Sequence, residues 1–279
     1  MESKVTELSD IASQKLSEVS LSLLLPLYIR AMETPHPQAI LRDQQAVELI
    51  QKLKIDASSF NQARVSEEVR VSILLRNRQF DLITSAYLAD HPGAVVVHLG
   101  CGLDSRFERV DNGQVEWYDL DLPEVINLRC ELIGGESERY HLLAYSALDE
   151  TWMEAVSIHL LRPYLFLAEG LFMFFEEQQV IRFVQTLRDR FPSSELVFDA
   201  FSPFYSWGNN RRVARTHIGA EVYWALKHGK ELEKLVEGVQ LIDEWFPFLC
   251  PEPRLQHIRW VRYIPLLSKT TGIFHYRLV

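Results

Sequence analysis

The hydrophobic residues of the first 90 positions recur at helical spacing, and no alternating strand pattern interrupts them. Three segments follow this spacing, at residues 5–23, 41–53 and 66–89. Pro35 and Pro37 separate the first two segments, because proline lacks an N–H donor and disfavours helix in the residue before it. We therefore expect residues 1–90 to form a helical N-terminal cap.

From residue 94 onward the pattern changes to short apolar runs separated by segments of helical spacing. This alternation is typical of β-α-β units and a parallel sheet, and hence of an α/β fold. Strands are expected at residues 95–99, 115–120, 140–145, 164–168 and 196–200. Helices are expected between them at residues 103–110, 123–133, 151–161 and 176–191.

The last third of the chain has a less regular pattern. Residues after Phe201 are rich in aromatic side chains and lack a clear period, whereas residues 217–235 have helical spacing. Two strand-like segments follow at 239–248 and 272–279, and we expect them to pair as a hairpin. No repeat or low-complexity linker divides the chain, which favours a single domain over residues 1–279.

Composition excludes several classes of function. A net charge of −9 argues against an extended nucleic-acid-binding face, because phosphate binding requires clustered Lys and Arg. The three cysteines form no CxxC pair and have no zinc spacing, so we expect reduced thiols and no metal. The apolar run at residues 21–29 is too short to span a bilayer, and the acidic N-terminus is unlike a signal peptide. These features predict a cytoplasmic protein without a membrane partner.

The stretch from Val95 to Phe107, VVVHLGCGLDSRF, reads as a strand, a glycine turn and the start of a helix. Gly100 and Gly102 allow a sharp turn and close approach of a ligand to the backbone. Free N–H groups at the following helix start are expected to supply donors. Ser105 stands where a dinucleotide fingerprint requires its third glycine, which weakens that alternative.

Polar or glycine positions follow four of the expected strands. Asp119 and Asp121 end the second strand, Ser146 follows the third, and Glu169 follows the fourth. In a doubly wound sheet these ends share one crevice, where an acid about 20 residues past the glycines accepts ribose hydroxyls. One of the two aspartates is expected to serve only as a strand-end or cap residue. Glu169 is flanked by apolar residues and should be partly buried with a partner.

Several of these segments, in this order and spacing, resemble the leucine carboxyl methyltransferase superfamily. They are LGCGLDSRFERV, WYDLDLPEVINLR, SALDETWM and LAEGLFMFF, preceded by LLLPLYIRAMET, ILRDQQAVELI and LLRNRQFD. Within the superfamily the chain is most similar to the bacterial polyketide-type, tetracenomycin-like O-methyltransferase branch. The resemblance implies a class I, Rossmann-like methyltransferase fold with S-adenosylmethionine as cofactor. Its seven-stranded sheet is mostly parallel, with an antiparallel last strand.

The resemblance also implies roles for individual residues. Gly100 and Gly102 would line the amino-acid and sugar portion of the cofactor, Asp121 would bind the ribose hydroxyls, and Ser146 and Ala147 would flank the adenine. Arg76 would pair with the methionine carboxylate, Glu169 would approach the ammonium group, and Arg30 is a second candidate carboxylate ligand. Many relatives carry an acidic residue at the position of Ser146. The serine can still donate or accept a hydrogen bond there, but it supplies no charge.

The methyl acceptor is less well defined. A carboxylate acceptor needs no general base, whereas a phenol or alcohol would benefit from one, and the sequence identifies no such base. By analogy with the fold, residues 202–238 are expected to be an insertion over the acceptor site, between the core at 94–201 and the hairpin at 239–279. Its candidate residues are Tyr205, Trp207, His217, Tyr223 and Trp224, with Arg211, Arg212 and Arg215.

The expected activity is thus O-methylation of a small molecule, at a carboxylate or at a phenolic or alcoholic oxygen. Alternatives are methylation of a protein C-terminal carboxylate, a non-catalytic S-adenosylmethionine-binding protein and, less favoured, a nicotinamide-dependent oxidoreductase. The sequence leaves the oligomeric state open.

Overall fold

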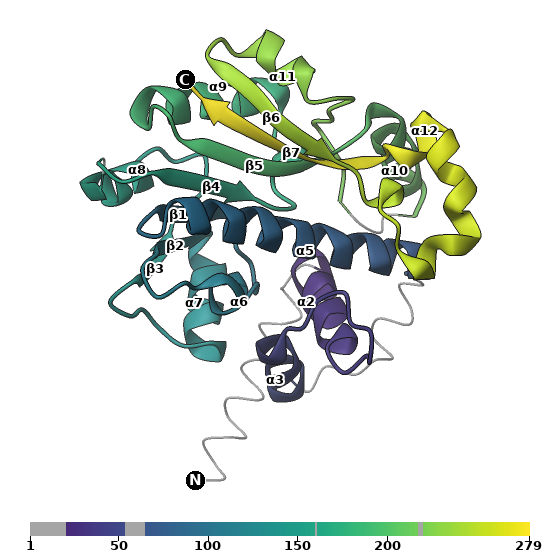
Figure 1. The fold of residues 1–279 in the computed structure, drawn as a ribbon, viewed down its shortest axis with the longest axis horizontal. Coiled ribbons are helices and arrows are strands. Elements are labelled where there is room, and N and C mark those ends of the chain that lie inside the picture. The colour runs from purple at the N-terminus through teal and green to yellow at the C-terminus, as the bar shows by residue number, and fades with distance from the viewer. Residues whose placement is uncertain (1–20, 54–64, 160, 217–219) are drawn as a thin grey trace.

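A seven-stranded sheet forms the centre of the molecule (Figure 1). The computed structural model describes residues 21–53, 65–159, 161–216 and 220–279. The strand order is β3-β2-β1-β4-β5-β7-β6, in which β1 to β5 pair in parallel and β7 runs antiparallel to both β5 and β6. The strands are β1 (Val95–Leu99), β2 (Glu116–Asp121), β3 (Tyr140–Ala144), β4 (Tyr164–Ala168), β5 (Glu195–Phe201), β6 (Val239–Trp245) and β7 (Thr271–Leu278). The expected Rossmann-like sheet is confirmed.

Helices cover both faces of this sheet. The α-helices of the described residues are α2 (Leu21–Glu33), α3 (Gln44–Lys52), α5 (Glu67–Asp90), α6 (Arg106–Val110), α7 (Pro123–Leu132), α8 (Trp152–Val156), α9 (Glu177–Arg190), α10 (Pro203–Thr216), α11 (Lys230–Leu235) and α12 (Pro265–Ser268). Short 3-10 helices are η1 (Ser157–His159), η2 (Phe172–Phe174), η3 (Pro247–Leu249) and η4 (Pro253–Tyr263).

The strands are apolar throughout because both of their faces are buried. Val95, Val97 and Leu99 of β1 pack into a core with α8, α9 and α11. Val96 points to the opposite face and packs with α5 and α6. This alternation places His98, the next residue with that orientation, on the α5 side of the sheet. A parallel sheet buried on both faces has such continuous apolar strands.

The N-terminal cap packs against the ends of the strands. In α3 the side chain of Asp43 accepts a hydrogen bond from the backbone N–H of Ala46 at 2.9 Å, which caps the helix start. Leu27 and Leu49 form an apolar cluster with Leu103 and Leu128, so α2 and α3 are joined to the loop after β1 and to α7. Figure 1 shows α2 and α3 below the long helix α5. Helices at 44–52 and 67–90 match the prediction; the expected helical residues before position 21 lie outside the described residues.

Two expectations for the last third of the chain are wrong. Helix α10 occupies residues 203–216, where no regular element was expected, and residues 220–226 are not helical. Val222, Trp224 and Leu226 are buried while the residues between them are less so, which is a strand-like alternation. The Asn210 amide fixes this segment to α10 through hydrogen bonds to both the N–H and the carbonyl of Val222.

The connection between the last two strands also differs from the expected hairpin. β6 and β7 do pair antiparallel, but residues 246–270 between them form η3, η4 and α12. This long connection packs on α5. Its several prolines interrupt the helical spacing, so the sequence pattern did not reveal it.

Candidate functional site

A cavity of about 800 Å³ opens at the carboxyl ends of β1, β2 and β4. This is the point at which the strand order reverses, where open α/β sheets bind their ligands. Leu23, Pro26 and Arg30 of α2 form one wall, and the turns after the three strands form the others. The cavity therefore lies between the cap and the sheet.

The glycine loop forms the wall that follows β1. Gly100 and Gly102 have φ angles of 66° and 54°, in the left-handed region that favours glycine. A Cβ atom at position 102 would lie 2.7 Å from Cδ1 of Leu23, so glycine also permits the cap to pack on the loop. Both glycines line the cavity, and their contact with the cofactor stays a prediction.

The N–H groups of the glycine turn itself are already paired, while the donors expected at the start of the following helix stay a prediction. The N–H groups of Gly100 and Cys101 donate to the Leu120 carbonyl at 2.8 and 3.1 Å, and that of Gly102 donates to Asp121 at 2.7 Å. Helix α6 begins only at Arg106, three residues later than predicted. The neighbouring strand therefore holds these donors, and the loop contributes close approach instead.

The structure separates the roles of the two aspartates at the end of β2. Asp121 lines the cavity, and its carboxylate oxygens accept the N–H groups of Gly102 and Leu122 at 2.7 and 2.8 Å. Burial raises the pKa of Asp121 despite these bonds. Asp119 is buried against Arg129 at 2.5 Å and accepts hydrogen bonds from Trp117 and Tyr140. Asp119 thus belongs to the core, whereas Asp121 faces the cavity.

Arg129 of α7 is a residue of this site that sequence reasoning missed. Its Nη1 donates to the carbonyls of Gly102 and Asp104 at 2.8 and 2.7 Å, while Nη2 bonds to Asp119. The side chain is 1% exposed, and the pairing with Asp119 holds its pKa above the ordinary value against the effect of burial. The guanidinium therefore anchors the glycine loop to β2.

Arg76 and Glu169 meet at the wall beside β4. Nε of Arg76 donates to Glu169 at 2.9 Å, and Nη1 donates to Asp199 of β5 at 2.9 Å. Glu169 also accepts hydrogen bonds from Asn77 and from Arg106, the latter at 2.6 Å. Although burial opposes ionisation, Arg76 and Arg106 lower the pKa of Glu169. The partner expected for Glu169 is thus supplied by arginines from α5 and α6.

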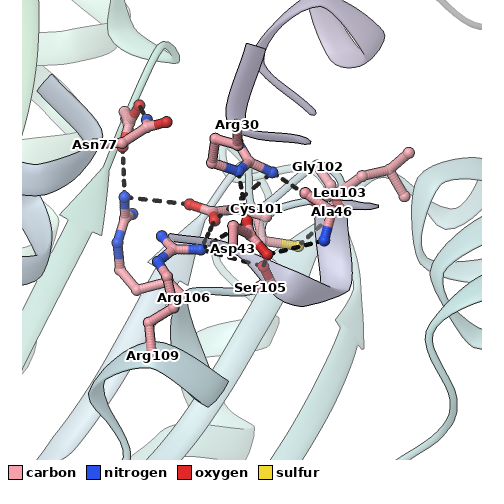
Figure 2. Close-up of polar contacts among 12 residues, drawn as sticks. Arg30, Asp43, Ala46, Asn77, Cys101, Gly102, Leu103, Ser105, Arg106 and Arg109 are labelled. Atoms are coloured by element: carbon pink, nitrogen blue, oxygen red, sulfur yellow. Dashed lines mark hydrogen bonds and ion pairs between the residues drawn. The ribbon is translucent and has the colours of Figure 1, made fainter. Parts of the chain in front are cut away.

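A second group of arginines joins the cap to the loop, as Figure 2 shows. Arg30 donates from Nε to Asp43 at 2.8 Å and from Nη2 to the Leu103 carbonyl at 2.9 Å. Arg109 of α6 contacts Asp43 at 3.1 Å and Asp104 at 2.9 Å. Arg30 lines the cavity, as predicted for a ligand contact, but two of its nitrogens already hold the cap in place.

The remaining predicted residues lie away from this cavity. Ser146 and Ala147 are not among its lining residues; they form the turn after β3, where the Ala147 carbonyl accepts the Trp152 indole N–H at 3.1 Å. Their role beside the adenine stays a prediction. In the described chain, no group of three His, Cys, Asp or Glu side chains is arranged to hold a metal ion, and no helix has the length and apolarity to cross a bilayer.

Among the described residues of the expected acceptor segment, none lines this cavity either. Trp224 is buried in the core against Phe172 and Phe198, with ring centroids 6.4 and 5.7 Å away. Trp207 and Tyr223 are exposed, and the Arg211 guanidinium stacks over Trp207 at 4.7 Å. The sequence pattern could not distinguish these core and surface aromatics from a substrate wall. His217 lies outside the described residues.

Comparison with known proteins gives the family. The leucine carboxyl methyltransferase family profile matches residues 24–188. The tetracenomycin polyketide synthesis O-methyltransferase TcmP of Streptomyces glaucescens is 32% identical over 94% of this chain and 97% of its own length. The S-adenosyl-L-methionine-dependent methyltransferase dpfgK of Gibberella zeae is 26% identical over 86% of each chain.

Solved structures agree on the fold. A DUF574 family protein from Streptomyces avermitilis has a TM-score of 0.62 at 15% identity, covering 94% of this chain and 98% of its own. Magnesium protoporphyrin IX methyltransferase from Synechocystis, solved with S-adenosylhomocysteine, has a TM-score of 0.50 at 11% identity over 85% of this chain and all of its own. The methyltransferase expectation is thus confirmed over the nicotinamide alternative, and the chain belongs to the leucine carboxyl methyltransferase family of S-adenosylmethionine-dependent methyltransferases.

Proposed function

We propose that this methyltransferase acts on an oxygen atom of a small molecule, and that this oxygen belongs to a carboxylate. The observation that carries the proposal is that four of the six carboxylate, thiol and imidazole side chains lining the described cavity are paired or buried. The other two are Asp121, which we assign to the ribose, and Glu124, which is exposed in the first turn of α7. A carboxylate is nucleophilic at neutral pH, whereas a phenol or alcohol needs a group to take its proton. The name of TcmP, a polyketide O-methyltransferase, supports an oxygen acceptor in a small molecule.

Four titratable side chains on the cavity wall are committed to other partners or buried. Asp104 lies 3.1 Å from Arg106 and 2.9 Å from Arg109, which hold its pKa well below the ordinary value. Glu169 is similarly held ionised, and burial keeps the pKa of the Cys101 thiol well above its usual value. His98 is 2% exposed and lies 3.3 Å from both Asp119 and Arg106. None of these four groups is placed to accept a proton from a substrate.

The cavity wall fits S-adenosylmethionine, which supplies an activated methyl group on its sulfonium when bound. Each Asp121 oxygen accepts one backbone N–H and retains lone pairs for the ribose hydroxyls. Arg76 has Nη2 available for the methionine carboxylate, and the ionised Glu169 favours the nearby ammonium. Gly100 and Gly102 leave room for close approach of the chain between these groups.

The remaining wall suits an apolar acceptor body. Leu23 and Pro26 of α2 line the cavity together with Leu171 and Phe174, which follow β4. These side chains exclude water and orient an acceptor next to the methyl group, and such alignment is the main requirement for in-line transfer. An aromatic acid is the kind of molecule that matches both the apolar walls and the shortage of free bases.

Transfer of labelled methyl groups tests the oxygen type. The protein is incubated with S-adenosylmethionine labelled in the methyl group and a panel of aromatic molecules bearing either a carboxylate or a phenol. We expect label only in carboxylate-bearing molecules, as methyl esters that release labelled methanol in mild base. Base-stable label in the phenols would contradict the carboxylate assignment.

A further inference from the structure

Asp199 is a fully buried carboxylate that neither the family comparison nor the proposed mechanism uses. It stands on β5 with 0% side-chain exposure, and it does not line the cavity. Burying a charge is unfavourable unless it is paired and hydrogen-bonded. The partners of its two oxygens therefore indicate what the position does.

The two oxygens contact two different walls of the cavity. Oδ2 accepts a hydrogen bond at 2.9 Å from Nη1 of Arg76, a residue of α5. Oδ1 accepts the backbone N–H of Gly170 at 2.5 Å, in the turn after β4. One carboxylate thus fixes a side chain and a backbone turn that are far apart in sequence and adjacent at the cavity.

This arrangement leaves one guanidinium nitrogen of Arg76, Nη2, for a ligand. Glu169 takes Nε and Asp199 takes Nη1, while Nη2 has no hydrogen-bond partner among the described residues. Arg76 lines the cavity and is 15% exposed, and its Nη2 lies 3.8 Å from where a Cβ of Gly170 would be. A planar guanidinium held on two of its edges can present the third in a fixed direction.

We propose that Asp199 is a positioning residue that aims the guanidinium of Arg76 at the amino-acid end of the cofactor. The inference rests on the proposed binding of the methionine carboxylate by Arg76. Asp199 itself touches no ligand, so its effect is confined to ligands that have this carboxylate. Ligands that present only the adenosine part do not depend on it.

Two ligands separate this effect from a general loss of structure. S-Adenosylhomocysteine contains the amino-acid end, whereas 5′-methylthioadenosine lacks it. Isothermal titration is performed with both on the wild type and on Asp199→Asn, which keeps size and an acceptor oxygen but removes the charge. We expect Kd for S-adenosylhomocysteine to rise roughly ten- to a hundred-fold, the effect of a lost charge-assisted contact, with Kd for methylthioadenosine unchanged.

Glu195→Gln is the matched control, on the same strand. Glu195 also pairs with basic side chains, accepting Nη2 of Arg277 at 2.8 Å and Nε2 of His275 at 2.7 Å, but it does not line the cavity. We expect this variant to bind both ligands as the wild type does. If Asp199→Asn fails to fold, Arg76→Lys takes its place in the test. Lysine keeps the positive charge but lacks the planar guanidinium, so we expect the same selective rise in Kd for S-adenosylhomocysteine.

Three outcomes would overturn the inference without contradicting the proposed cofactor contacts. Unchanged affinity of Asp199→Asn for both ligands means that the carboxylate does not position Arg76, and an equal loss for both means that it only maintains the fold. A wild-type protein that binds neither ligand contradicts the proposed cofactor contacts themselves. An additive effect of Asp199→Asn in an Arg76→Lys background would also contradict the link between the two residues.

Discussion

At the scale of single residues, Arg129 connects the glycine loop to the sheet. Its guanidinium bonds to two carbonyls of the loop and to the buried Asp119. No sequence pattern indicated this role, because an arginine in a short amphipathic helix normally faces solvent and its partners lie up to 27 residues away. Asp199 was missed for the same reason, since its partner Arg76 is 123 residues distant.

Replacement of Arg129 should therefore destabilise the protein strongly. We expect Arg129→Met to lower the free energy of unfolding by about 3–5 kcal/mol, because Asp119 would remain buried without its counter-charge. Urea denaturation followed by circular dichroism measures this change. Arg139→Met removes an ion pair with Asp111 that is accessible to solvent, and should leave the stability nearly unchanged. Equal stability of the two variants would show that Arg129 is not a structural anchor.

At the scale of elements, close packing of α2 on the glycine loop joins the cap to the site. Leu23 contacts the position where any side chain at residue 102 would begin. Gly113 offers a comparison, because it has a left-handed φ of 79° but no heavy atom within 4 Å of the place that a Cβ would occupy. Alanine at Gly113 would meet only the unfavourable backbone conformation, whereas alanine at Gly102 would also collide with Leu23. Comparing the two substitutions therefore separates the two contributions to the loss of stability.

Both glycine-to-alanine substitutions should destabilise the protein, and to different degrees. The left-handed backbone costs about 1–2 kcal/mol in either variant. Gly102→Ala should lose about 1–3 kcal/mol more, because Leu23 and α2 must shift. Chemical denaturation compares the two variants, and binding of S-adenosylhomocysteine should weaken only in Gly102→Ala. Equal losses of stability would show that the cap does not pack on the loop as described.

Local patterns predicted most elements but failed where tertiary contacts decide. The strands β1 and β4 have the predicted bounds, because a strand buried on both faces reads as an uninterrupted apolar run. Residues 220–226 are instead non-helical, and their burial depends on contacts with α10 and with the turn after β4. The backbone N–H of Tyr223 donates to the Met173 carbonyl in that turn at 2.9 Å. The spacing of hydrophobic residues along the sequence does not indicate such a contact.

At the scale of the whole molecule, the order of the strands assembles the cavity. Parallel strands place their carboxyl ends at one edge, so Gly100, Asp121 and Glu169 meet although they are up to 69 positions apart in the sequence. That much of the site was predictable from strand ends. The arginine pairings that hold these walls, and the absence of the described 202–238 aromatics from the cavity, required the three-dimensional structure.

Asp121 is the residue of this cavity that we assign to the ribose of S-adenosylmethionine. Isothermal titration of S-adenosylhomocysteine into the wild type, Asp121→Ala and the surface control Asp111→Ala tests this assignment. We expect Asp121→Ala to weaken binding roughly ten- to a hundred-fold, the cost of one or two hydrogen bonds to a charged acceptor, with Asp111→Ala unchanged. Wild-type affinity in Asp121→Ala would contradict the ribose assignment.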